Sequence, residues 1–236
     1  MAKAGKIYRA NAAKVDRNKR YALSDALKLL DSYQNHKFDE TVEVAFRLGV
    51  DPKQSDQMVR GASMLPHGIG KTIRVLVVAR GDAEREAKEA GADIVGNDDV
   101  IEKIAGGWLD FDRVLTTPDT LKDLTKVAKV LGPRGLMPNK KTGTVTTEIG
   151  KAVKEQKLGK VEYKVEKAGI VHSLIGKKSF GPDKLKANFM ALFETILKAK
   201  PSTSKGVYIR KIALSPAMGP SIILDHGPLV NIGQAA

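Results

Sequence analysis

Two kinds of hydrophobic pattern occur in this chain, and their order constrains the fold more than any other feature. In the middle, a β-branched run at 73–79 indicates a strand that is buried on both faces. Strands that alternate with helices are typical of a parallel sheet covered by helices, so we expect a Rossmann-like α/β module here. The expected order is strands at 73–79, 93–95 and 113–117, with helices at 82–91, 98–105 and 118–132.

Toward both ends of the chain, apolar and polar residues alternate instead. Every second residue of 42–50 is Val, Phe or Leu, so a strand at 41–50 would bury one face. This alternation is typical of antiparallel sheets that have one side in the core. Further strands are expected at 161–165 and 206–214, and an apolar helical stripe runs from Leu185 to Leu197.

The charge is divided along the same lines. The chain has 40 Lys and Arg residues against 27 Asp and Glu, a formal net charge of +13. The stretch 67–159 holds 16 basic and 14 acidic residues, so the two ends carry +11 of that total. We therefore predict two domains. One is an α+β split domain with an antiparallel sheet and helices, built from residues 1–67 and 160–236; the other is an inserted α/β Rossmann-like domain with a parallel sheet, residues 68–159.

A basic chain of this kind favours a phosphate-rich partner. An anionic membrane is the alternative, but no expected helix is basic on one face and strongly apolar on the other. The start of the chain lacks the apolar core of a signal peptide, which predicts a cytoplasmic protein. Aromatic residues make up only 5% of the chain, which argues against a surface of stacked single-stranded bases. DNA-binding motifs with helix-turn-helix or finger spacing are also missing.

The segment Gly68-Ile-Gly-Lys-Thr72 resembles the end of a nucleotide-binding loop. Such a loop needs another glycine five positions before Gly70, where Leu65 stands, and it must open a helix. An apolar strand is expected instead, and no Gly-x-Gly-x-x-Gly follows that strand. A Rossmann-type enzyme with a nucleotide cofactor remains the alternative interpretation of the fold, without a motif to support it.

Other reaction chemistry finds little support. The chain has no cysteine, and its four histidines are too far apart in sequence for a metal motif, so we expect neither metal nor cofactor. The acidic pairs Asp39-Glu40 and Asp98-Asp99 have no nucleophile beside them and are interpreted as structural. The Gly- and Pro-rich segment 131–144 carries Arg134, Lys140 and Lys141, which would suit a sugar-phosphate surface; a solvated turn is the alternative.

Four stretches of the sequence resemble the bacterial L1 family of large-subunit ribosomal proteins, which belong to the mobile stalk beside the exit site. The similarity extends from about Lys6 to Ser221. It is carried by Lys37-Phe-Asp-Glu-Thr-Val-Glu-Val44, Asp51-Pro-Lys-Gln-Ser-Asp-Gln-Met-Val-Arg-Gly61, Leu131-Gly-Pro-Arg-Gly-Leu-Met-Pro-Asn139 and Ala217-Met-Gly-Pro-Ser221.

The resemblance implies a protein that is not an enzyme, is monomeric when free and works on the ribosome in the cytoplasm. The domain built from both chain ends would bind large-subunit ribosomal RNA. The same surface would bind the messenger of its own operon and so repress translation. The inserted domain would face deacylated tRNA in the exit site and assist its release.

The resemblance also assigns roles to individual positions. The implied RNA contacts are Lys37, Phe38, Thr41, Lys53, Arg60, His172, Ser173, Lys177, Met218, Gly219, Pro220 and Ser221. Arg134, Lys140 and Lys141 would form the loop that faces tRNA, and Gly68, Gly70 and Gly159 would form the hinge between domains. Core packing of Phe38 and a structural ion pair of Arg60 are alternatives. Many bacterial relatives have threonine where Ala217 stands, so a hydroxyl contact at that position is absent here.

Overall fold

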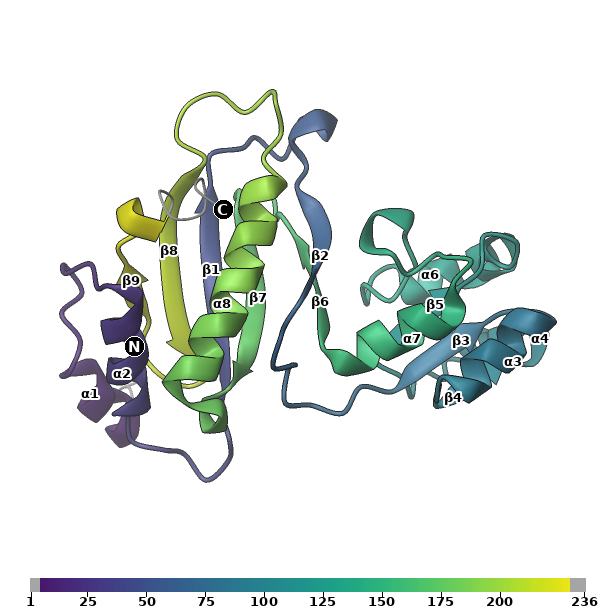
Figure 1. The fold of residues 1–236 in the computed structure, drawn as a ribbon, viewed down its shortest axis with the longest axis horizontal. Coiled ribbons are helices and arrows are strands. Elements are labelled where there is room, and N and C mark those ends of the chain that lie inside the picture. The colour runs from purple at the N-terminus through teal and green to yellow at the C-terminus, as the bar shows by residue number, and fades with distance from the viewer. Residues whose placement is uncertain (1–4, 230–236) are drawn as a thin grey trace. The chain divides into compact units, whose positions relative to one another are not determined.

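The computed structural model describes residues 5–229 of the chain (Figure 1). They divide into two compact units. The first takes residues from both ends of the chain, up to Gly70 and from Val161 onward, and the second spans Lys71–Lys160. Each unit has an apolar core of its own.

The first unit is built on a four-stranded antiparallel sheet with the strand order β7-β1-β8-β9. Two helices, α2 and α8, pack together over the face that carries the core, and Figure 1 shows α8 running along the strands. Strands β2 and β6 form a second, two-stranded sheet. The elements are α1 (Lys6–Ala12), α2 (Leu23–Asp31), β1 (Thr41–Leu48), η1 (Ser55–Gln57), β2 (Arg60–Met64), β6 (Lys160–Lys164), β7 (Ile170–Lys177), η4 (Lys178–Phe180), α8 (Gly181–Lys198), β8 (Ile209–Pro216) and β9 (Ile222–Leu224).

The alternation in the sequence explains how β1 packs. Its even-numbered residues are all buried, while Glu43 and Arg47 are exposed on the other face. Phe46 lies at the centre of the core, with its ring centroid 5.9 Å from that of Phe189 and 6.3 Å from that of Phe193. Val50, expected in this strand, lies beyond its end.

The second unit contains a parallel sheet with the order β4-β3-β5. All four residues of β3 are buried, as its apolar sequence predicts, because helices cover both faces of the sheet. Helices α3 and α7 pack together on one face, and α4, α5 and α6 enclose the apolar core on the other. The elements are β3 (Val75–Val78), α3 (Asp82–Glu89), β4 (Ile94–Gly96), α4 (Asp98–Ala105), β5 (Arg113–Thr116), α5 (Leu121–Leu124), η2 (Thr125–Val127), α6 (Ala128–Leu131), η3 (Lys140–Thr142) and α7 (Ile149–Leu158).

The fold class is the predicted one, but the expected helix at 118–132 is wrong in detail. It starts only at Leu121 and is split into α5, η2 and α6. The late start has a local cause, since the Thr120 hydroxyl donates to the Val78 carbonyl at 2.8 Å and ties the turn to the end of β3. The split lies in a stretch with β-branched Thr125 and Val127, which lowers helix propensity.

Asp112 makes the stability of the second unit depend on pH. Its carboxylate accepts hydrogen bonds from Lys71 Nζ at 2.7 Å and from the Arg74 amide at 3.1 Å. The bond from Lys71, followed by that from Arg74, lowers the pKa of Asp112 in the folded protein. Because the folded pKa is the lower one, the stabilisation is present above the unfolded value of about 3.9 and is lost as pH falls through the folded value.

We therefore expect the melting temperature of the second unit to fall on acidification below about pH 4, partly through this group. In Asp112→Asn, the melting temperature should be lower at neutral pH and should decline less steeply between about pH 5 and pH 2. Thermal unfolding followed by Trp108 fluorescence measures this, because Trp108 lies in the second unit. Parallel profiles for the two proteins would contradict it.

Candidate nucleic-acid interface

Three strand ends that are distant in sequence meet at one end of the four-stranded sheet. Thr41 begins β1 and pairs with Lys177 at the end of β7, while Val42 pairs with Pro216 at the end of β8. Lys177 Nζ donates to Thr41 Oγ1 at 2.9 Å, and the Ala217 amide donates to the Thr41 carbonyl at 3.0 Å. The antiparallel register therefore brings the predicted RNA contacts Thr41 and Lys177 together with the stretch that begins at Ala217.

We call this region the strand-end surface. It comprises Lys37, Phe38, Thr41, Lys177, Met218 and Gly219. Two of its apolar side chains are open to solvent: Phe38 is 54% exposed and Met218 is 56% exposed. The exposure of Phe38 disfavours the alternative of core packing. An apolar ring and a thioether next to ammonium groups can contact bases and sugars while the cations meet phosphates.

The loop that carries Met218 is shaped by close packing. A Cβ atom on Gly219 would lie 2.5 Å from Pro216 Cγ and 3.4 Å from Tyr33 Cδ2, so only glycine fits without a shift. The Tyr33 hydroxyl lies 3.4 Å from the Pro220 carbonyl oxygen, and burial raises the pKa of that phenol. Of the two last residues of the motif, Pro220 is buried and Ser221 is exposed.

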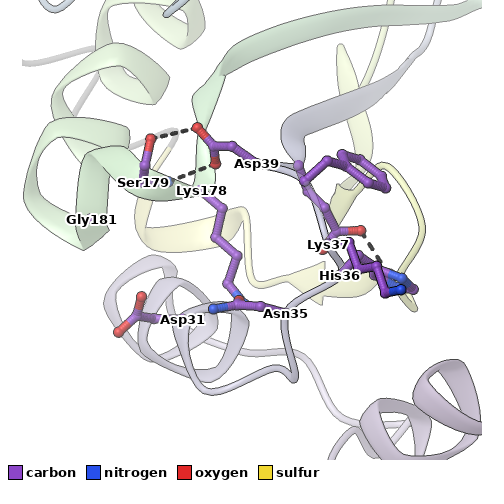
Figure 2. Close-up of a pocket in the computed structure, with 10 residues that line it drawn as sticks. Asp31, Asn35, His36, Lys37, Asp39, Lys178, Ser179 and Gly181 are labelled. Carbon is purple, nitrogen blue, oxygen red and sulfur yellow. Dashed lines mark hydrogen bonds and ion pairs between the residues drawn. The ribbon is translucent and has the colours of Figure 1, made fainter.

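A cavity of about 500 Å³, lined mostly by polar and charged residues, opens beside the strand-end surface (Figure 2). Asp39 lies in its wall and accepts hydrogen bonds from the Ser179 amide at 3.1 Å and the Ser179 hydroxyl at 2.6 Å. Lys178 Nζ donates to Asn35 Oδ1 at 2.5 Å and to the Tyr33 carbonyl at 2.7 Å, and burial lowers its pKa. Asp39 is thus held by structural bonds, as interpreted from the sequence, and sequence reasoning missed both Lys178 and Tyr33.

The remaining RNA-contact candidates lie elsewhere. Lys53 follows the opposite end of β1, and Arg60 begins β2 in the other sheet. His172 is exposed in the middle of β7, with its Nε2 atom 4.0 Å from a Glu166 carboxylate oxygen. Ser173 pairs with Val44 and is only 9% exposed, so its hydroxyl points to the core side. These four residues are not part of the strand-end surface, and their contacts with RNA stay predictions.

The loop of the second unit has a firm framework and exposed cations. The Asn139 side chain accepts from the Lys141 amide at 2.8 Å, and the Asn139 amide donates to Thr144 Oγ1 at 2.7 Å. Arg134, Lys140 and Lys141 all point to solvent and take part in none of the ion pairs found among residues 5–229. Their charges are therefore free to meet an anionic partner.

The glycines assigned to the hinge have left-handed backbone conformations. The φ angles are 68° for Gly68, 76° for Gly70 and 115° for Gly159, where side chains are strained. The cation of the Gly-Lys-Thr segment, Lys71, is engaged by Asp112, and strand β3 follows it. The segment thus leads into a strand, as the sequence predicted, whereas a nucleotide-binding loop opens a helix.

Residues 5–229 contain no group of three or more acidic or histidine side chains that could hold a metal ion. Within the same range, no helix is both long and apolar enough to cross a membrane.

A model of the ribosomal protein L1p/L10e family matches residues 30–220. The chain is 57% identical to the large ribosomal subunit protein uL1 of Bdellovibrio bacteriovorus over 222 residues. The aligned residues make up 94% of this chain and 95% of that protein. It is 56% identical over 225 residues to the protein of the same name from Solidesulfovibrio magneticus. This alignment includes 95% of this chain and 96% of the relative.

The matches to the two uL1 proteins extend over nearly the whole chain. They confirm the resemblance inferred from four short motifs, and they correct the alternative interpretation as a nucleotide-dependent enzyme. The protein is a ribosomal protein and not an enzyme, and its location is the ribosome in the cytoplasm. By its sequence, its two-unit fold and these relatives, the chain belongs to the ribosomal protein L1 family.

Proposed function

We propose that this structural protein of the large subunit binds ribosomal RNA of the mobile stalk through its strand-end surface. The observation that carries the proposal is the convergence of Thr41, Lys177 and Met218, three positions from separate stretches that the register of β1 with β7 and β8 unites. Exposed apolar groups next to cations suit RNA, in which phosphate contacts orient the protein and base or sugar contacts give selectivity. The net charge of +13 supplies the long-range attraction.

Equilibrium binding of the pure protein to a stalk fragment of large-subunit ribosomal RNA tests this. Titrations at several salt concentrations, with unrelated duplex RNA as competitor, separate selective contacts from general charge. We expect tight binding that survives the competitor, with a salt dependence equivalent to a handful of phosphate contacts. Binding that the competitor removes completely would mean that only non-specific charge acts.

We further propose that the two units serve as the two predicted domains and that the first binds RNA by itself. The first unit carries the whole strand-end surface and has its own core. A variant in which a short Gly-Ser linker replaces residues 71–160 should keep most of the affinity of the full chain for the stalk fragment. Circular dichroism checks that the variant is folded. A folded variant that no longer binds would put the main contact in the second unit.

For the second unit we propose a contact with deacylated tRNA in the exit site, made by the exposed Arg134, Lys140 and Lys141. Replacing all three by alanine should slow the release of exit-site tRNA from reconstituted ribosomes, since three phosphate partners are lost. Binding of the stalk fragment should be unchanged, because this loop is not part of the strand-end surface. Equal loss of tRNA release and of stalk-RNA binding would contradict the proposal that the two units bind different RNAs.

Two more roles complete the proposal. The strand-end surface would also bind the messenger of the protein's own operon and thereby repress translation, so stalk RNA and messenger should compete for one site. Simultaneous binding of both RNAs would contradict that. Gly68, Gly70 and Gly159 would act as the hinge that lets the second unit move, because glycine tolerates large changes in φ and ψ.

A further inference from the structure

A buried carboxylate lies directly beneath the strand-end surface. Glu40 is 2% exposed, although it directly precedes Thr41, a member of the surface that is proposed to receive phosphates. Burial of a carboxylate is costly unless hydrogen bonds compensate for lost water, and its negative charge would repel RNA. Because Glu40 is costly both for folding and for RNA binding, we expect it to make a contact that compensates for these costs.

The contacts of Glu40 show what that contribution is. Its Oε1 atom accepts a hydrogen bond from the backbone amide of Met218 at 3.1 Å. The same oxygen lies 3.8 Å from His36 Nε2, in the segment that leads to Phe38. Its own carbonyl accepts from the Lys178 amide at 2.8 Å. One side chain therefore touches the segments that present the two exposed apolar groups of the surface.

The other restraints on this loop are weaker or act at its ends. The Ala217 amide is bonded to Thr41 at 3.0 Å, but the Gly219 amide reaches the Pro216 carbonyl only at 3.3 Å. The contact of the Tyr33 hydroxyl with Pro220 is longer still, at 3.4 Å. Hydrogen bonds to an ionised acceptor are about twice as strong as neutral ones. The bond that the Met218 amide donates to Glu40 thus holds the loop at the residue whose side chain faces solvent.

We propose that Glu40 is a positioning residue for RNA binding, which holds Met218 in place through the backbone amide. This inference rests on the proposed function of the strand-end surface. Positioning and charge have opposite consequences here. If only charge mattered, neutralising Glu40 would strengthen RNA binding; if the carboxylate positions the loop, removing the acceptor weakens binding despite the lost repulsion.

Variants of matched size separate the two effects. Glu40→Gln has the same length and keeps an acceptor oxygen that can take the place of Oε1 opposite the Met218 amide. Glu40→Met has similar length but no acceptor. Glu40→Asp keeps the charge, but its side chain is one methylene shorter, so the carboxylate lies farther from the Met218 amide. Glu43→Gln is the control, since it removes the same charge from an exposed position of the same strand.

We expect Glu40→Met and Glu40→Asp to bind the stalk RNA at least about tenfold more weakly than the wild type. Glu40→Gln should stay within about threefold of the wild type, and Glu43→Gln should bind no more weakly. Hydrogen exchange of the Met218 amide, measured by NMR, should be faster in the Met and Asp variants only. Rescue by glutamine would not be expected from a general need for the charge.

The outcomes are distinct. Wild-type affinity in Glu40→Met, or equal loss in Glu40→Gln and Glu40→Met, overturns the positioning role. If Glu40→Met does not fold, Glu40→Asp decides, because wild-type affinity in that variant overturns the proposal in the same way. Failure of the proposed function would show in a different measurement, because the wild-type protein would then not bind the stalk RNA selectively.

Discussion

Met218→Asp is expected to weaken binding of stalk RNA by at least about tenfold, which corresponds to about 1.4 kcal/mol. The side chain of Met218 is 56% exposed, so the substitution does not open a cavity in the core. It places a carboxylate within the strand-end surface, where it would repel phosphates and remove the apolar contact. Competition titration against the wild-type protein, at one salt concentration, measures the change.

Met64→Asp is the matched control for this experiment. Met64 is also an exposed methionine, at 43%, but it ends β2 in the separate two-stranded sheet. The same change of charge there should reduce RNA affinity far less. Equal losses in the two variants would mean that net charge determines binding, whereas unchanged affinity in Met218→Asp would remove this loop from the contact surface.

Phe46→Ala is expected to reduce the free energy of unfolding of the first unit by about 4 kcal/mol. Phe46 is fully buried, and its ring lies among those of Phe189 and Phe193 beneath α8. Alanine leaves a cavity that these rings cannot close without leaving their own packing. Denaturant unfolding followed by circular dichroism should show the first unit unfolding earlier, while the transition seen by Trp108 fluorescence in the second unit stays in place.

Phe38→Ala provides the opposite case. Because the Phe38 ring is 54% exposed, its removal should change the stability of the first unit little and lower RNA affinity instead. Loss of stability without loss of affinity in this variant would show that Phe38 packs rather than binds. A small effect of Phe46→Ala on stability would in turn contradict the placement of the core under α8.

The elements that the sequence predicted well are those with strong periodicity. The uniform apolar run before residue 80 became the central strand β3, and the alternating residues of β1 lie inward and outward as expected. Helix α7 was missed because one of its inward positions is Gln156, which breaks the apolar stripe although it is fully buried. Strand β9 has three residues, too few to show a period.

The candidate site was predictable in part. The resemblance named positions in the first and last of its four stretches that the structure brings together, but it grouped Lys53 and Ser173 with Met218, and the strand-end surface does not include those two. The acidic pair at 39–40 was interpreted as one structural feature, although the structure gives its members different neighbours. Asp39 bonds the chain at Ser179, whereas Glu40 holds the amide of Met218.

By itself, the sequence indicated one antiparallel and one parallel sheet, the excess of positive charge at the two ends and the membership of a ribosomal family. Local spacing suffices for the sheets and the charge, because strand and helix periods and charge are properties of neighbouring residues, whereas the family was indicated by the resemblance of four short motifs. Only the tertiary structure decided which candidates share a surface. Thr41 and Met218 meet because β1 and β8 pair in one particular register, and that register depends on burying a whole face of the sheet at once.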